Sequence, residues 1–189
     1  QQLRQALPGW LEDAENGLTD SFRALLNGLA EDLRYLDDRV AALDDRIVES
    51  VRKDPVAKRL MTLRGVGPLT ASALSGALGD GKAFRRGRDF AASLGLTPKQ
   101  HSTGGRDRLL GISKRGDSYL RKQLVHGARA VLRHVDGKDD GLSHWLKGLA
   151  SRKHINVATV ALANKTARIA WALAHGEEDY DEKLAAAGA

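Results

Sequence analysis

A long run of apolar residues at spacings of three and four constrains the fold of this chain more than any other feature. Such spacing places the apolar side chains on one stripe of a helix, which is the pattern of a coiled-coil seam. Two pairs of consecutive spacings of four, from Leu25 to Leu33 and from Leu43 to Val51, predict local unwinding of the supercoil. The alternative is an amphipathic helix that packs on its own domain. The run lies in residues 18–53 and consists of Leu18, Phe22, Leu25, Leu29, Leu33, Leu36, Val40, Leu43, Ile47 and Val51.

The rest of the chain predicts a mostly α-helical fold with almost no strand. Pro8-Gly9 indicates a linker or a broken element over residues 1–10, so residues 1–54 are expected to be a linker and a coiled-coil helix. Residues 55–175 are expected to form a compact helical domain, and the acidic, Ala-rich residues 176–189 a disordered tail. The elements expected in the compact domain are helices at 56–63, 70–78, 88–94, 117–134, 142–150 and 156–174, and an extended loop at 98–116 with a small hairpin through 109–112. Asn156 is the predicted N-cap of the last helix.

The helix expected after Asp117, its predicted N-cap, has two distinct faces. Leu120, Leu124, Ala128 and Val131 form an apolar face, where Gly127 would let a neighbouring helix approach closely. A second face is basic, because cations recur on it at steps of four, three and four. Its members are Lys122, His126, Arg129 and Arg133.

Positive charge is concentrated in one block of the sequence. Residues 82–133 hold 13 Lys or Arg and three Asp or Glu, whereas residues 1–60 hold 9 and 12. Such a block predicts a polyphosphate partner, with a solvated basic surface as the alternative. The chain has no cysteine, which excludes disulfides and thiol nucleophiles, and no apolar run approaches the roughly 20 residues that span a bilayer. We therefore expect a nucleic-acid partner and no membrane.

A Gly-Val-Gly turn between two short predicted helices is the pattern of a helix-hairpin-helix. Gly65 and Gly67 allow a tight turn and close approach of the backbone to a phosphate. The free N–H groups that follow, at Leu69 and Thr70, favour an anion. The alternative is a turn that only joins two packed helices.

Ser102 lies in a second glycine turn, His101-Ser102-Thr103-Gly104-Gly105. A hydroxyl that attacks a phosphodiester needs exposure, nearby cations and a proton acceptor. The cations are present, but adjacent residues often point apart, so His101 is a doubtful base. The alternative is a serine that only shapes the turn or donates to a phosphate. The nucleic-acid-binding candidates are Gly65, Gly67, Thr70, Arg85, Arg86, Lys99, Arg106, Arg108, Lys114, Arg115, Arg121 and Arg129.

Acidic residues are scarce around this turn. Only Asp89, Asp107 and Asp117 are acidic between residues 81 and 135, and a two-metal nuclease site needs several carboxylates close together. We therefore expect no metal site and no cofactor in this chain.

Three segments carry a resemblance to a known family: LRGVGPLTASALSGALGDGKAF, LGLTPKQHSTGGRDRLLGISKRGDSYLRKQLVHGARAVL and NVATVALANKTARIAWAL. In order and spacing they resemble the C-terminal transposase domain of the bridge-RNA-guided insertion-sequence recombinases. These enzymes pair an N-terminal RuvC-like DEDD domain with a serine in the C-terminal domain. The resemblance covers about residues 55–175, and the preceding helix is similar to the coiled coil of that family.

The resemblance implies a mechanism and a set of partners. Ser102 would attack DNA and form a 5′-phosphoserine linkage, while Mg²⁺ would be held by the RuvC-like domain. The coiled coil would join protomers, and a structured guide RNA would select DNA by base pairing in the bacterial cytoplasm, at the nucleoid. Relatives often show two serines in the turn, so Thr103 is the alternative nucleophile.

The sequence departs from the family pattern because it lacks the DEDD domain. It also lacks an initial Met, so we expect a C-terminal fragment that is inactive alone. Two other hypotheses remain open. The chain could be a non-catalytic coiled-coil module that binds nucleic acid, or a protein-interaction scaffold built on the coiled coil.

Overall fold

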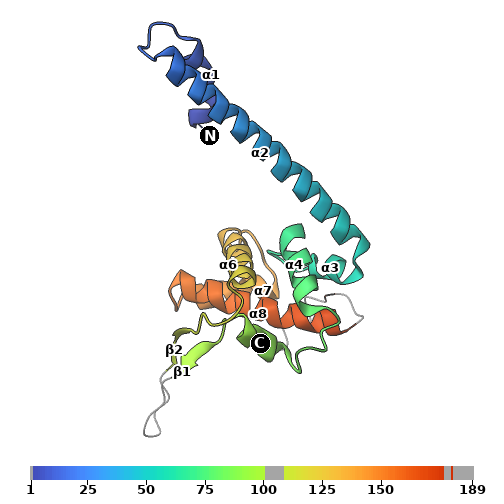
Figure 1. The fold of residues 1–189 in the computed structure, drawn as a ribbon. Coiled ribbons are helices and arrows are strands. Elements are labelled where there is room, and N and C mark those ends of the chain that lie inside the picture. The colour runs from blue at the N-terminus through green and yellow to red at the C-terminus, as the bar shows by residue number, and fades with distance from the viewer. Residues whose placement is uncertain (1, 101–108, 177–179, 181–189) are drawn as a thin grey trace. The chain divides into compact units, whose positions relative to one another are not determined.

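The computed structural model describes residues 2–100, 109–176 and 180, and its chain divides into two units, Gln1–Arg46 and Ile47–Ala189. The described residues are mostly helical, as predicted (Figure 1). Ser102, Thr103, Arg106 and Arg108 lie outside the described residues, and so do most of the residues expected to form the tail.

The first unit contains α1 (Gln2–Glu12) and most of α2 (Asp20–Lys53). The expectation of a broken element at Pro8-Gly9 is wrong, because both residues lie inside α1. Tertiary contacts support this helix. Arg23 of α2 donates hydrogen bonds to the backbone oxygens of Trp10 (3.1 Å) and Leu11 (2.8 Å) near the carboxyl end of α1. Satisfied carbonyls at that end offset the missing N–H of Pro8.

The predicted long helix is present as α2, and its apolar seam faces solvent. Leu36 is 52% exposed and Val40 is 57% exposed. Val51, the last residue of the predicted seam, is instead buried in the core of the second unit, so it does not belong to an exposed seam. The unwinding predicted from Leu25 to Leu33 stays a prediction.

The second unit packs around one central helix, α8 (Ile155–His175), which crosses the unit in Figure 1. Helix α8 contacts the five helices α3 to α7. Its buried face is rich in alanine, and Ala158, Ala163, Ala167 and Ala170 are completely buried, so neighbouring helices approach closely. The other helices are α3 (Pro55–Leu60), α4 (Pro68–Leu78), α5 (Gly87–Ser93), α6 (Ser118–Arg133) and α7 (Gly141–Ala150).

Of two predicted helix N-caps, that of α6 is confirmed and that of α8 is wrong. The Asp117 carboxylate accepts from the Leu120 N–H (2.9 Å), so the predicted N-cap of α6 is confirmed. The N-cap of α8 lies two residues earlier than predicted. It is His154, whose ring accepts from the Asn156 N–H at 3.2 Å, so the prediction of Asn156 as the cap is wrong.

The predicted hairpin is present as β1 (Pro98–Gln100) and β2 (Leu109–Ile112), an antiparallel pair. Backbone hydrogen bonds attach its base to the end of α5. The Ser113 N–H donates to the Thr97 oxygen (2.8 Å) and the Lys114 N–H to the Gly95 oxygen (3.1 Å). The residues between the strands include Ser102, so the segment that carries this residue connects two paired strands.

Candidate nucleic-acid interface

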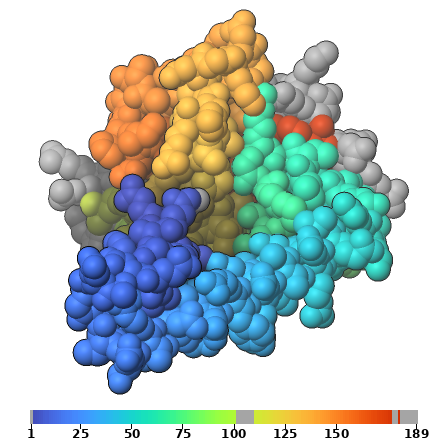
Figure 2. Space-filling model, turned by 90° about the horizontal axis from the view of Figure 1, so that it is seen from above, coloured from blue at the N-terminus to red at the C-terminus, as the bar shows by residue number. Residues whose placement is uncertain are grey.

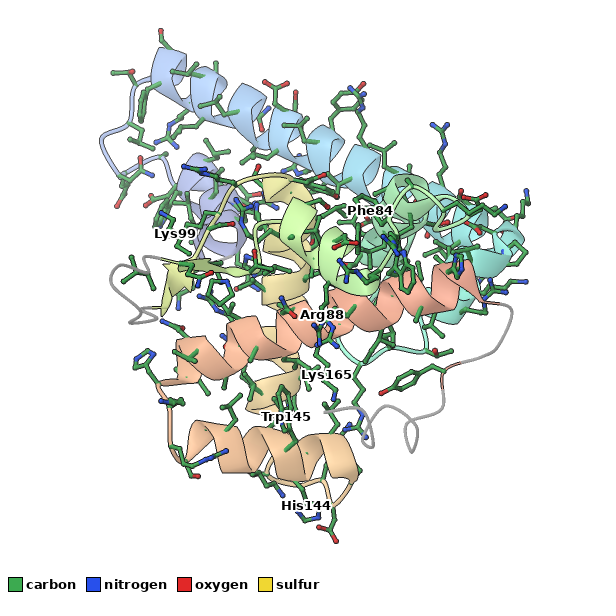
Figure 3. All side chains as sticks on the ribbon, turned by 90° about the horizontal axis from the view of Figure 1, so that it is seen from below. Phe84, Arg88, Lys99, His144, Trp145 and Lys165 are labelled. Carbon is green, nitrogen blue, oxygen red and sulfur yellow. The ribbon has the colours of Figure 1, made fainter. Side chains whose placement is uncertain are left out.

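An open pocket of about 330 Å³ lies at the base of the β1–β2 hairpin. It is lined by Lys99 and Gln100 from β1 and by Ser113 and Arg115, which follow β2. Two of these side chains are cationic, the other two can donate hydrogen bonds, and none is acidic. Figure 3 labels Lys99 on the hairpin. This donor set suits the oxygens of a phosphodiester.

Two glycines position Arg115 in this pocket. Gly95 and Gly116 both have left-handed φ angles, +68° and +110°. A side chain on Gly95 would overlap the backbone of Arg115, and one on Gly116 would overlap the Ser93 oxygen. The loop 113–117 therefore lies directly against the end of α5. Lys114 is also left-handed (φ +56°), a conformation that costs an L-residue about 1–2 kcal/mol.

The Gly-Val-Gly turn packs against α6. Gly65 has φ +80°, and a Cβ atom on it would lie 2.6 Å from the Gly127 oxygen. Gly127 therefore permits close approach, but of the turn before α4 and not of a neighbouring helix as predicted, and Gly65 has a packing role. A Cβ atom on Gly67 would have nothing within 4 Å, and Gly67 is exposed, so its side of the turn is open.

The first turn of α4 follows that open side. Gly67 is its N-cap and provides no side-chain hydrogen bond, and Pro68 occupies the first helical position. The Thr70 side chain is only 7% exposed, which leaves the backbone N–H as its means of contact with an anion. The nucleic-acid-binding prediction for Gly67 and Thr70 thus concerns the backbone.

The other predicted cations that the structure describes lie on different elements. Arg121 donates a hydrogen bond from Nη1 to the Leu94 backbone oxygen (2.9 Å). This bond links α6 to the end of α5. Arg85 and Arg86 are exposed before α5, and Arg86 pairs with Asp89 (3.5 Å). Arg129 is exposed on α6. Among the described residues, Lys99 and Arg115 are the predicted cations that line the pocket.

A cation–π contact between Lys165 and Trp145 could not be predicted from the sequence. Lys165 Nζ of α8 lies 5.2 Å from the centre of the Trp145 ring of α7, and Figure 3 shows both side chains between the two helices. Burial, with the positive charge of Arg168, lowers the pKa of Lys165. Their separation of twenty residues along the chain leaves no local pattern that could have found the pair.

An ion pair fixes α7 beside the Gly-Val-Gly turn. Arg64, which precedes the turn, donates to the Asp140 carboxylate at 2.8 Å. The same carboxylate accepts from the Ser143 N–H (2.8 Å) and so caps α7. The Arg64 hydrogen bond is the main cause of a pKa of Asp140 well below its usual range, although burial opposes the shift.

The described parts of the chain contain no group of three or more His, Asp or Glu side chains arranged to hold a metal. These described residues therefore do not provide the cluster of ligands that a Mg²⁺ ion needs. Within the same described ranges, no helix has the length and apolar character that crossing a membrane requires.

Comparison with known proteins identifies the domain that carries this pocket. Residues 57–141 match the model of the Transposase IS116/IS110/IS902 family. The chain carries a transposase domain of this family. The matched residues include α4, α5, the hairpin and α6, so the pocket lies inside the transposase domain.

The similarity to individual relatives covers more of the chain than residues 57–141. A probable family 20 transposase of Pseudomonas aeruginosa is 53% identical over 156 residues, which are 82% of this chain and 46% of the relative. The transposase for insertion sequence element IS1111A of Coxiella burnetii is 42% identical over 176 residues, 93% of this chain and 48% of the relative. The pilin gene-inverting protein of Moraxella bovis is 25% identical over 162 residues, 82% and 49%. The chain spans about half the length of these curated relatives.

Proposed function

We propose that residues 55–175 are the serine-bearing domain of a DNA transposase in which Ser102 attacks a DNA phosphodiester. The observation that carries the proposal is the cationic pocket of Lys99 and Arg115, at the base of the hairpin that leads to Ser102; its described lining residues include no acid. The family match supports a transposase, and the alternative nucleophile is Thr103.

The proposed reaction is a transesterification. The Ser102 oxygen forms a bond to phosphorus, the bond from phosphorus to the DNA 3′-oxygen breaks, and the serine proton is transferred to that leaving oxygen. The product is a 5′-phosphoserine linkage and a free 3′-hydroxyl, so religation needs no external energy source. Lys99 and Arg115 would bind the phosphate and stabilise the negative charge that develops in the transition state.

The remaining parts of the proposed machinery come from outside the described pocket. A RuvC-like domain of the full-length protein would supply carboxylates that hold Mg²⁺, which stabilises charge on phosphate oxygens. A structured guide RNA would select the DNA sites. The exposed seam of α2 would join protomers, and the assembly would act in the bacterial cytoplasm at the nucleoid.

A non-catalytic nucleic-acid-binding module is the second candidate function. The observation that favours it is that the described residues lining the pocket, Lys99, Gln100, Ser113 and Arg115, include no carboxylate or histidine that could accept a proton. It predicts that Ser102 influences affinity alone.

The two functions are separated in the full-length protein with its guide RNA and DNA. Ser102→Ala should abolish recombination and the covalent protein–DNA adduct, whereas Thr103→Ala should retain both. Omission of the RNA should abolish recombination by the unaltered protein. If Ser102→Ala still forms the adduct at the original level, the assignment of Ser102 is wrong.

A further inference from the structure

Five side chains form a single polar stripe along the solvent face of α6. At 100° per residue they fall within an arc of about 80° around the helix axis. Tyr119 is 48% exposed, and the four basic side chains are also exposed. We name this set the α6 stripe; it consists of Tyr119, Lys122, His126, Arg129 and Arg133.

The opposite face of α6 fixes the direction of the stripe. Leu120, Leu124, Ala128 and Leu132 are buried there in the core. Because the core holds this face, the helix cannot rotate to cover the stripe. Figure 2 shows α6 on the surface of its unit, in yellow between α4 and α7.

The charge on the stripe is not neutralised by its own helix. Helix α6 contains no Asp or Glu. Among the described residues, no ion pair joins Lys122, Arg129 or Arg133 to a carboxylate. A stripe of one sign, on a rigid helix, concentrates positive potential along a line.

The stripe has the dimensions of a backbone-binding element. From Lys122 to Arg133 it extends over eleven residues, or about 16 Å at 1.5 Å per residue. A straight, inflexible row of cations suits the backbone of a straight double helix, where each contact neutralises one phosphate. The Tyr119 hydroxyl can donate a further hydrogen bond to a phosphate oxygen.

We propose that the α6 stripe binds the sugar-phosphate backbone of double-helical DNA. The proposal rests on the proposed transposase function for the choice of DNA, which relatives named as transposases of insertion sequences support. A protein partner is disfavoured because Tyr119 is the single aromatic residue of the stripe and no large aliphatic side chain lies on it.

The experiment measures binding of this chain to fluorescently labelled duplex DNA over a range of salt concentrations. The test variant combines Lys122→Gln, Arg129→Gln and Arg133→Gln, and the control combines Arg52→Gln, Lys58→Gln and Lys153→Gln. Both variants lose three exposed charges, and Gln has nearly the helix propensity of Lys and Arg. Circular dichroism and thermal unfolding check that each variant is folded.

The stripe variant should bind at least tenfold more weakly at about 0.1 M salt. Its slope of log K against log salt should decrease by about 2–3, at roughly 0.9 for each lost phosphate contact. The control should keep a slope within about 0.5 of the unaltered chain. Tyr119→Phe, which removes the hydroxyl alone, should weaken binding about two- to tenfold with little change in slope.

Three results would overturn the proposal. One is an equal slope for the stripe variant and the control, and another is an absence of duplex binding by the unaltered chain. The third is a loss of binding to structured RNA with duplex binding unchanged, which would assign the stripe to RNA. The covalent adduct tests the serine mechanism and the salt slope of duplex binding tests the stripe, so failure of one and failure of the other give different results.

Discussion

Gly65 and Gly127 lie so close together that a side chain on either one would overlap the backbone of the other. The turn before α4 and the middle of α6 therefore form one packed joint. This contact sets the position of the first turn of α4 relative to α6, which carries the basic stripe.

Gly127→Ala should destabilise the domain, although alanine favours a helix by about 1 kcal/mol over glycine. A methyl group there meets the Gly65 oxygen, and overpacking of this kind typically costs about 1–3 kcal/mol. Urea unfolding measures the difference. Gly76→Ala is the matched control, since it lies inside α4 with nothing within 4 Å, and it should be neutral or stabilising. Equal stabilisation by both variants would show that the joint is not tight.

Asp140→Asn should lower stability by about 1–2 kcal/mol near pH 7, because it removes a charged partner of Arg64 and retains an N-cap oxygen. The Arg64 hydrogen bond holds the folded pKa of Asp140 below its ordinary value of 3.8, although burial acts in the opposite direction. The carboxylate therefore contributes its stability above about pH 4, and this contribution is lost as the pH falls through the folded pKa.

The measurement is urea unfolding of both proteins at about pH 7 and pH 3. The difference between them should be smaller at the lower pH. Asp139→Asn is the control, because that carboxylate is 91% exposed and should contribute little at either pH. A difference that grows on acidification would contradict the assignment.

Val40→Glu should weaken self-association of the chain at least tenfold, because it places a charge in the exposed seam of α2. Ala42→Glu adds the same charge two residues away, on an exposed position outside the seam, and should leave association unchanged. Sedimentation equilibrium measures the association constant. An unaltered chain that remains monomeric at high concentration would rule out pairing of two copies through this seam.

Lys99→Gln with Arg115→Gln should reduce the salt slope of DNA binding by about two, one for each phosphate contact. Both side chains line the hairpin pocket, and both residues are exposed. Fluorescence anisotropy over a salt series provides the slope, and Lys58→Gln with Lys153→Gln serves as the charge-matched control. Identical slopes for the two double variants would show that the pocket does not contact DNA.

Much of the fold could be predicted from local patterns. The spacing of leucines predicted α2, the Asp117 cap predicted the start of α6, and the glycine-rich stretch with few periodic residues predicted the hairpin. Helix α1 could not be predicted from its own residues, because Pro8-Gly9 is a breaking signal. The hydrogen bonds that support it come from Arg23, in another helix.

The candidate site, too, could be predicted from the sequence only in part. The basic block and the family resemblance pointed to the Ser102 segment, and Lys99 and Arg115 were predicted as binding residues. The participation of Gln100 and Ser113 in their pocket depends on the pairing of two strands. Sequence spacing does not show which side chains face each other across such a pair.

The amino-acid sequence by itself determined the helical class, the apolar face of each helix and the concentration of positive charge. These are local properties, because the helical repeat relates neighbouring residues directly. Tertiary structure decided that Val51 lies in the core, that Arg121 binds the Leu94 carbonyl and that Gly65 meets Gly127. Periodicity shows which face a helix buries, whereas the partner of that face depends on how distant segments pack together.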